Sequence, residues 1–177
     1  MTFHLKNLDP ATRSRMSQEV AVDTTEGKLY ISPRLTPEGA ARYPTLLAEA
    51  VASHDMTWLA SQLRHSGSLL AKEQKRKPSG GYTLADVPYT AADTLAEGEF
   101  NRFYIRGLCL RAVEENIPVL IVYCAKEVAN ARSESQRKIG TSVNPQVLLA
   151  DLRTHVGVDT ALGLPQGPNS GLSFYIP

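Results

Sequence analysis

The chain has few cysteines and histidines, and the motifs of several large enzyme classes are missing from it. Two of its 177 residues are cysteines and four are histidines. No cysteine stands at metal-ligand spacing from a histidine, so the sequence predicts no metal site. It contains no GxxxxGK[ST] phosphate loop, no strand-linked GxGxxG, no HExxH and no GxSxG. We therefore expect no metal and no cofactor.

The two cysteines, Cys109 and Cys124, fall in a predicted helix and a predicted strand. This placement predicts two buried free thiols in a reducing compartment rather than a disulfide. The first residues lack the apolar core of a signal peptide, and no stretch reaches the roughly 18 apolar residues that a membrane span needs. We expect a cytoplasmic protein without a membrane partner.

An excess of charge of one sign is also lacking. Lysine and arginine together number 19, aspartate and glutamate 18, and the formal net charge is +1. Such a balance gives no global attraction to nucleic acid, so any contact with a polyanion must come from a local patch.

Length and composition are those of one folded domain, with 42% hydrophobic and 21% charged residues. We expect an α+β fold that is rich in helix, with a small sheet around a central buried strand near 118–124. The pattern divides the chain into a helical half at 1–70, a basic loop or linker at 71–89, and an α+β half at 90–177. Together they are expected to form one compact domain.

Helix starts are the clearest local signals. Each has a capping residue, and three of the four have proline in the next position. The predicted caps are Asp9, Thr36, Thr90 and Asn144. Pro44 predicts a kink or a later helix start. Apolar runs predict a short strand at 29–32, the buried strand that ends at Cys124, and a last strand at 172–176 that adds to a sheet edge of this chain or of a neighbouring subunit.

The long helix predicted from Ala91 to Asn116 carries Glu99, Arg102 and Arg106 within about 60° of one another on a helical wheel. Other directions around this helix are apolar, which predicts burial of these charges. Two interpretations remain open. The three residues form an internal ion cluster that orients the helix, or Arg106 has spare donors for a phosphate or carboxylate of a ligand.

Tyr104 lies on a second polar stripe of the same helix with Arg111, which predicts a solvated edge or an interface. If the protein is an enzyme, Glu99 and Tyr104 are the candidates for acid–base catalysis.

Basic residues gather in two further segments. The first is the 71–89 stretch, and the second follows the buried strand, where ligands often bind in mixed folds. These cations can flank one groove and contact phosphates, with Tyr82 and Tyr89 near enough in sequence to stack on bases. Alternatively, they lie on solvated loops that local glutamates balance. The residues concerned are Lys75, Arg76, Lys77, Lys126, Arg132, Arg137 and Lys138.

Three functions follow, in order of preference. The first is a non-enzymatic module that binds DNA or RNA through these cations, with Arg102 and Arg106 orienting the scaffold or reaching the ligand. The second is a structural or assembly protein that acts as a homo-oligomer or within a larger complex. The third is a small enzyme or nuclease acting on an anionic substrate. The nuclease pattern requires a metal-binding acid two residues before Lys126. This chain has Cys124 there, so the pattern fails at the position that would hold the metal.

Overall fold

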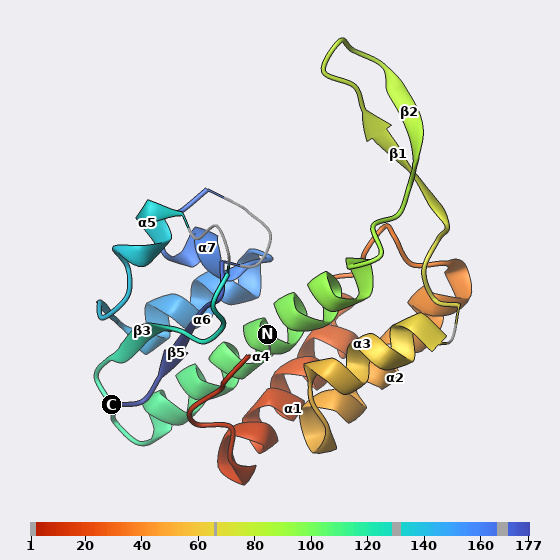
Figure 1. Cartoon of the computed structure of the whole chain (residues 1–177). Coiled ribbons are helices and arrows are strands. Elements are labelled where there is room, and N and C mark those ends of the chain that lie inside the picture. Colours follow the sequence, from red (N-terminus) through yellow and green to blue (C-terminus); the bar gives the residue numbers. More distant parts are fainter. Residues whose placement is uncertain (1–2, 66, 129–131, 166–169) are drawn as a thin grey trace.

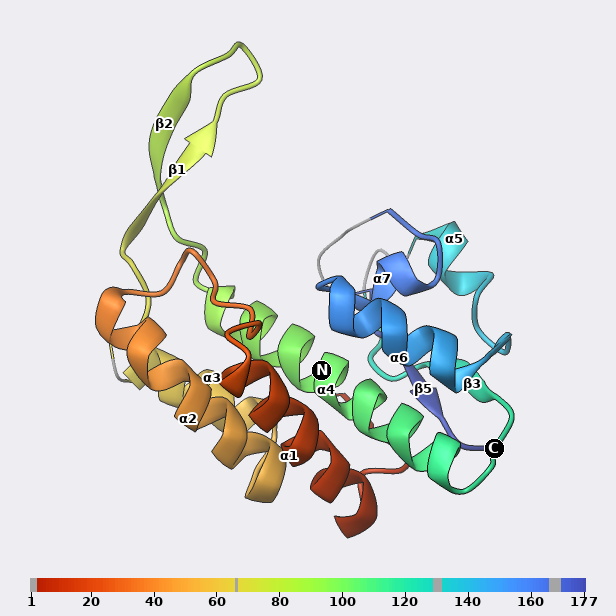
Figure 2. The same ribbon diagram turned by 180° about the vertical axis from the view of Figure 1, so that it is seen from behind.

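One long helix, α4 (Ala91–Glu114), runs through the middle of the molecule, as the computed structural model shows (Figures 1 and 2). The structure describes residues 3–65, 67–128, 132–165 and 170–177. Helices α1 (Pro10–Thr25), α2 (Pro37–Ser53) and α3 (Met56–His65) pack on one side of α4. On the other side lie α6 (Pro145–Thr154) and a small sheet. The predicted α+β, helix-rich, single-domain fold is confirmed.

The burial predicted for α4 is also confirmed. Phe100, Phe103, Ile105 and Leu108 point in different directions around the helix, and all four are inaccessible to solvent. Gly107 brings α1 close, since a Cβ on this residue would lie 2.8 Å from the Met16 side chain. A helix that is apolar on every side must be surrounded by other elements, which explains why both halves of the chain pack on α4.

Capping side chains fix the starts of three helices. The side chains of Asp9, Thr36 and Asn144 accept hydrogen bonds from backbone N–H groups in the first turns of α1, α2 and α6. Thr90 precedes α4 but makes no such side-chain bond. Pro44 lies inside α2, which continues unbroken to Ser53 instead of starting anew.

Replacing Asn144 with alanine should lower the free energy of unfolding by about 1 kcal/mol, because Val147 N–H then loses its side-chain acceptor. Urea unfolding measures this loss. Asn144→Ser restores an oxygen acceptor and should recover most of the stability. Equal stability of the alanine and serine variants would show that the cap contributes nothing.

A three-stranded antiparallel sheet covers the second side of α4. Strand β3 (Leu120–Cys124) lies in its middle, between β4 (Ser142–Val143) and β5 (Leu172–Tyr175). The predicted central strand is therefore present, and the last strand pairs within its own fold. Two short helices, α5 (Ser133–Gln136) and α7 (Val158–Ala161), complete this side.

The 71–89 segment is not a loop but a β-hairpin that projects from the body (Figures 1 and 2). Strand β1 (Lys72–Arg76) pairs with β2 (Tyr82–Asp86). Gly80 and Gly81 adopt φ values of 90° and 78° in the turn, a region that residues with a Cβ rarely enter. The sequence predicted a loop or linker here instead of two strands. Nearly all side chains of the two strands are exposed, so the sequence shows no alternation of apolar and polar residues.

Two further predictions were wrong. Residues 29–32 form no strand, and Leu35 makes only an isolated bridge to Leu69. Cys109 and Cys124 are both free, but Cys124 is exposed because it lies at the end of β3.

Candidate functional site

The guanidinium of Arg106 is fully enclosed by carboxylates from α1. It donates to both oxygens of Asp23, at 2.6 and 2.8 Å, and its Nε donates to Glu19 at 2.7 Å. The side chain of Arg106 is 0% exposed. This arginine is therefore held inside the fold and reaches neither surface nor cleft.

Arg102 extends the same network toward the other end of α4. It donates to Glu99 at 3.1 Å and to the carbonyl of Leu152 at 3.1 Å, and its second terminal nitrogen lies 3.5 Å from Asp23. Arg153 of α6 donates to Glu19. We call the six charged residues of these contacts the ion network: Glu19, Asp23, Glu99, Arg102, Arg106 and Arg153. Three acids face three guanidiniums, so the internal-cluster interpretation accounts for the contacts of Arg102 and Arg106.

Glu99 and Glu19, at the two ends of the ion network, differ in the pKa of their carboxyl groups. Burial raises the pKa of the Glu99 carboxyl to about 7, although Arg102 acts in the opposite direction. At Glu19, burial alone would raise the pKa, but hydrogen bonds and charge from Arg153 and Arg106 bring it below its ordinary value. The carboxyl of Glu99 therefore changes its charge near neutral pH, whereas that of Glu19 does not.

Tyr104 does not lie on a solvated edge, as its stripe on α4 suggested. Its side chain is fully buried, and its hydroxyl donates to the Phe174 carbonyl at 3.2 Å and accepts from the Asn7 N–H at 3.2 Å. Burial raises the pKa of Tyr104 above its ordinary value. These two hydrogen bonds join the N-terminal segment to β5. The ring of Tyr104 is buried because it is largely apolar and its one polar atom finds partners inside the fold.

The cations of the hairpin tip are exposed. Among the described residues, Lys75, Arg76 and Lys77 form no ion pair. Arg34 and, more weakly, the charge of Lys75 lower the pKa of the Glu73 carboxyl. Nearer the body, Lys72 bonds Asp86 at 3.0 Å across the strands. The base of the hairpin is tied to the body by Arg34, which donates to both oxygens of Glu73 at 2.6 and 2.8 Å.

The cations that follow β3 have different surroundings. Lys126 bonds Glu97 of α4, and Arg132 donates to the Pro165 carbonyl at 3.0 Å. Arg137 and Lys138, at the end of α5, have no side-chain partner among the described residues. The structure thus leaves these two and the three at the hairpin tip available for other contacts.

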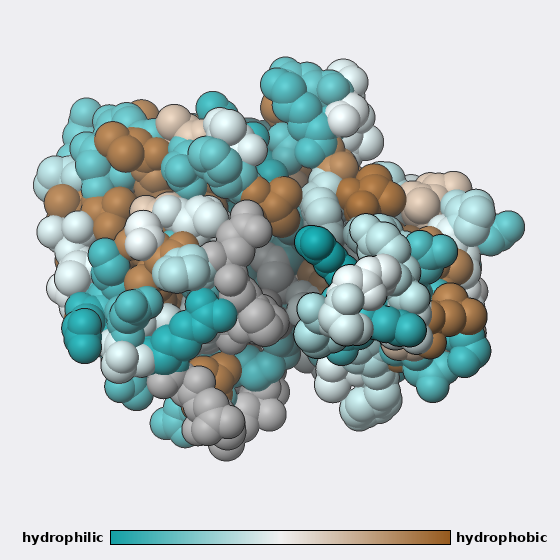
Figure 3. All heavy atoms as spheres, turned by 90° about the horizontal axis from the view of Figure 1, so that it is seen from above, coloured by the Kyte–Doolittle hydropathy of each residue, from teal (hydrophilic) through white to brown (hydrophobic). Residues whose placement is uncertain are grey.

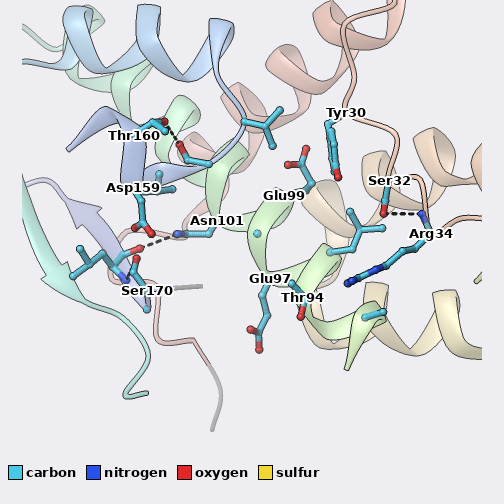
Figure 4. Close-up of a pocket in the computed structure, with 18 of the residues that line it drawn as sticks. Tyr30, Ser32, Arg34, Thr94, Glu97, Glu99, Asn101, Asp159, Thr160 and Ser170 are labelled. Carbon is cyan, nitrogen blue, oxygen red and sulfur yellow. Dashed lines mark hydrogen bonds between the residues drawn. The ribbon is translucent and has the colours of Figure 1, made fainter. Parts of the chain in front are cut away.

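A cleft of about 550 Å³ lies over the first half of α4. One wall is formed by the segment around Tyr30 and Arg34 and by the base of the hairpin, and the other by α7 and the residues before β5. Thr94, Leu95 and Glu99 belong to its floor, and Figure 4 shows the side chains that line it. Seen from above, the molecular surface is hollowed between these two sides (Figure 3).

The hairpin and α5 lie on opposite sides of the molecule, as Figures 1 and 2 show. The sequence predicted that the two basic segments flank one groove, but none of the cations predicted for it is among the described residues that line this cleft. Among the described residues, the lining has four carboxylates and one cation: Glu73, Glu97, Glu99, Asp159 and Arg34. Arg34 is already paired with Glu73, so the cleft itself does not favour a polyanion.

Several residues of these sites were missed at the sequence level. Glu19 and Asp23 follow Met16 and Val20 at helical spacing, so two acids within an apolar stripe were the available signal. Nothing near Arg34 or Asp159 in the sequence marks either residue, because the fold brings them to the cleft from distant segments.

No protein-family model matches the chain, and no curated protein or solved structure shows significant similarity to it. Within residues 3–65, 67–128, 132–165 and 170–177, no group of three or more His, Cys, Asp or Glu side chains is placed to hold a metal ion. None of the helices described is long and apolar enough to cross a membrane. A function must therefore be argued from the hairpin, the ion network and the cleft alone.

Proposed function

We propose that the protein binds nucleic acid, with the tip of the β1–β2 hairpin contacting the phosphate backbone. The observation that carries this proposal is the run of three adjacent exposed cations, Lys75, Arg76 and Lys77, none of which forms an ion pair with a described residue. Local charge of this kind attracts phosphates even where the whole chain is nearly neutral.

The register of the hairpin adds a second element of recognition. Arg76 pairs with Tyr82, so their side chains lie on the same face, and Tyr82 is 67% exposed. Lys75 pairs with Thr83 and belongs to the opposite face. A strand of nucleic acid on the first face meets a guanidinium for phosphate and an aromatic ring for stacking, a combination typical of single-strand binding.

The hairpin also has the shape that such contact requires. It projects beyond the body, and only its base is fixed, through Arg34 and Glu73 (Figure 1). In this proposal α4 is the scaffold, and Arg102 and Arg106 orient it from the interior without touching the ligand. Arg137 and Lys138 are a second place for phosphates across the cleft.

The variant Lys75→Gln/Arg76→Gln/Lys77→Gln should bind short DNA and RNA roughly tenfold to 100-fold more weakly at low salt. The slope of log affinity against log salt should become shallower by roughly two to three, because about that many phosphate contacts are lost. Fluorescence anisotropy with labelled single-stranded and double-stranded oligonucleotides measures both quantities.

The matched comparison is between two variants that each remove two positive charges, Lys75→Gln/Lys77→Gln and Arg137→Gln/Lys138→Gln. The hairpin pair is expected to have the larger effect. Unchanged affinity of the hairpin variants, or no binding by the natural protein at low salt, would overturn the proposal. If the hairpin variants instead changed the oligomeric state in light scattering, the hairpin would be an assembly contact.

A further inference from the structure

The cleft over α4 contains a carboxylate oxygen that the fold leaves without a partner. Asp159 lines the cleft from α7 and is 6% exposed, and its Oδ1 has no hydrogen bond from any residue that the structure describes. In Figure 4 its carboxylate points toward Asn101 and Ser170, which also line the cleft. A buried carboxylate oxygen without a donor is costly, so a ligand that supplies a donor gains affinity there.

The remaining charges of the lining are already paired, which leaves Asp159 as the exception. Arg34 is held by both oxygens of Glu73, Glu97 accepts from Lys126, and Glu99 accepts from Arg102. Because these three cations face the other lining carboxylates, Asp159 is the described lining group that favours a positively charged ligand.

The lining also selects among cations. No group of three or more potential metal ligands occurs among the described residues, so a bare metal ion finds too few donors here. Apolar side chains, among them Leu95, Val158 and Leu172, share the cleft with Tyr30. They suit a carbon chain next to a charged group, as in an alkyl amine or an alkyl guanidine.

We propose that this cleft binds a small organic cation, whose ammonium or guanidinium group donates to Asp159 while its carbon chain lies against the apolar lining. Glu99 also lines the floor, but its carboxyl is engaged by Arg102, so Asp159 is the group that holds the positive charge. The cation comes either from a free amine or from a lysine or arginine side chain of a peptide. This site includes Glu73 at the base of the hairpin but not the cations of its tip, and it does not depend on the nucleic-acid proposal.

Isothermal titration calorimetry of the full chain with agmatine and butylamine tests this directly. Both are expected to bind at millimolar concentration, whereas butanol and butyrate are not. Asp159→Asn should weaken agmatine binding at least about tenfold, as expected when a hydrogen bond to a charged group is lost. Titration with a short arginine-containing peptide, blocked at both ends, distinguishes the two sources of the cation.

Asp151→Asn is the matched control. Asp151 of α6 also has a buried carboxylate oxygen without a partner, but it does not line the cleft. This variant should bind agmatine like the natural protein. Thr94→Trp, which fills the floor and leaves Asp159 in place, should abolish binding and keeps the test valid if Asp159→Asn fails to fold. Failure of both cations to bind, equal affinity of Asp159→Asn, or binding of butyrate would overturn the proposal.

Discussion

Replacing Arg106 with alanine is expected to lower the free energy of unfolding by about 3 to 5 kcal/mol, the largest effect of any single substitution considered for this chain. The loss arises because Glu19 and Asp23 stay buried after their shared guanidinium is removed, and a cavity is left where the side chain was. A domain of this size is typically stable by about 5 to 15 kcal/mol, so the variant should unfold at much lower urea concentration.

Arg111→Ala provides the control on the same helix. Arg111 also contacts two carboxylates, those of Asp9 and Glu115, but their side chains are 43% and 42% exposed to water. Its removal should cost no more than about 1 kcal/mol. Combining Arg106→Met with Asp23→Asn should recover part of the loss, because one unpaired charge then disappears. Equal costs for Arg106→Ala and Arg111→Ala would contradict the burial argument.

Stability should decrease as pH rises from about 5 to 8, by about 2 to 3 kcal/mol. The reason is Glu99, whose pKa is about 7 in the folded protein against an ordinary value of 4.5. Across this window the folded state holds a proton that the unfolded chain has already released. Raising the pH therefore removes a stabilising term that is fully present below the ordinary pKa. Glu19 has a lowered pKa and acts below this window, with the opposite sign.

Glu99→Gln should flatten this dependence, because glutamine has the shape of the protonated acid and does not titrate. Urea unfolding at several pH values, compared with the natural protein, measures the difference. Glu114→Gln, at a half-exposed carboxylate near the end of α4, should leave the slope unchanged. The same slope in Glu99→Gln and in the natural protein would show that other groups cause it.

The sequence predicted those parts of the fold that local chemistry determines. Caps at Asp9, Thr36 and Asn144 marked three helix starts, and the apolar run before Cys124 marked the central strand, because each signal is complete within a few residues. The hairpin was missed because backbone pairing between its two strands defines it, while its exposed side chains show no strand pattern in the sequence. Pro44 was overestimated as a break, since tertiary packing of Tyr43 and Leu47 holds α2 together around it.

The candidate sites were predictable only in part, for a related reason. The wheel position of Glu99, Arg102 and Arg106 showed that they belong together, but their partners Glu19 and Asp23 lie about eighty residues away in the chain. Asp159 joins Glu99 in the cleft only after α6 and α7 have packed on α4. Contacts over such separations follow from the tertiary fold, which no short pattern encodes.

The hairpin leaves and rejoins the body at one place, since the Val87 N–H donates to the Ala71 carbonyl at 3.0 Å. Its length is thus uncoupled from the packing of α3 and α4. Adding matched pairs of residues to both strands would move the charged tip outward by about 3.4 Å per residue in each strand, with the core unchanged. The length and the charge of the hairpin can therefore change without a change in the packing of the core. Evolution or protein design can alter this projection separately from the rest of the fold.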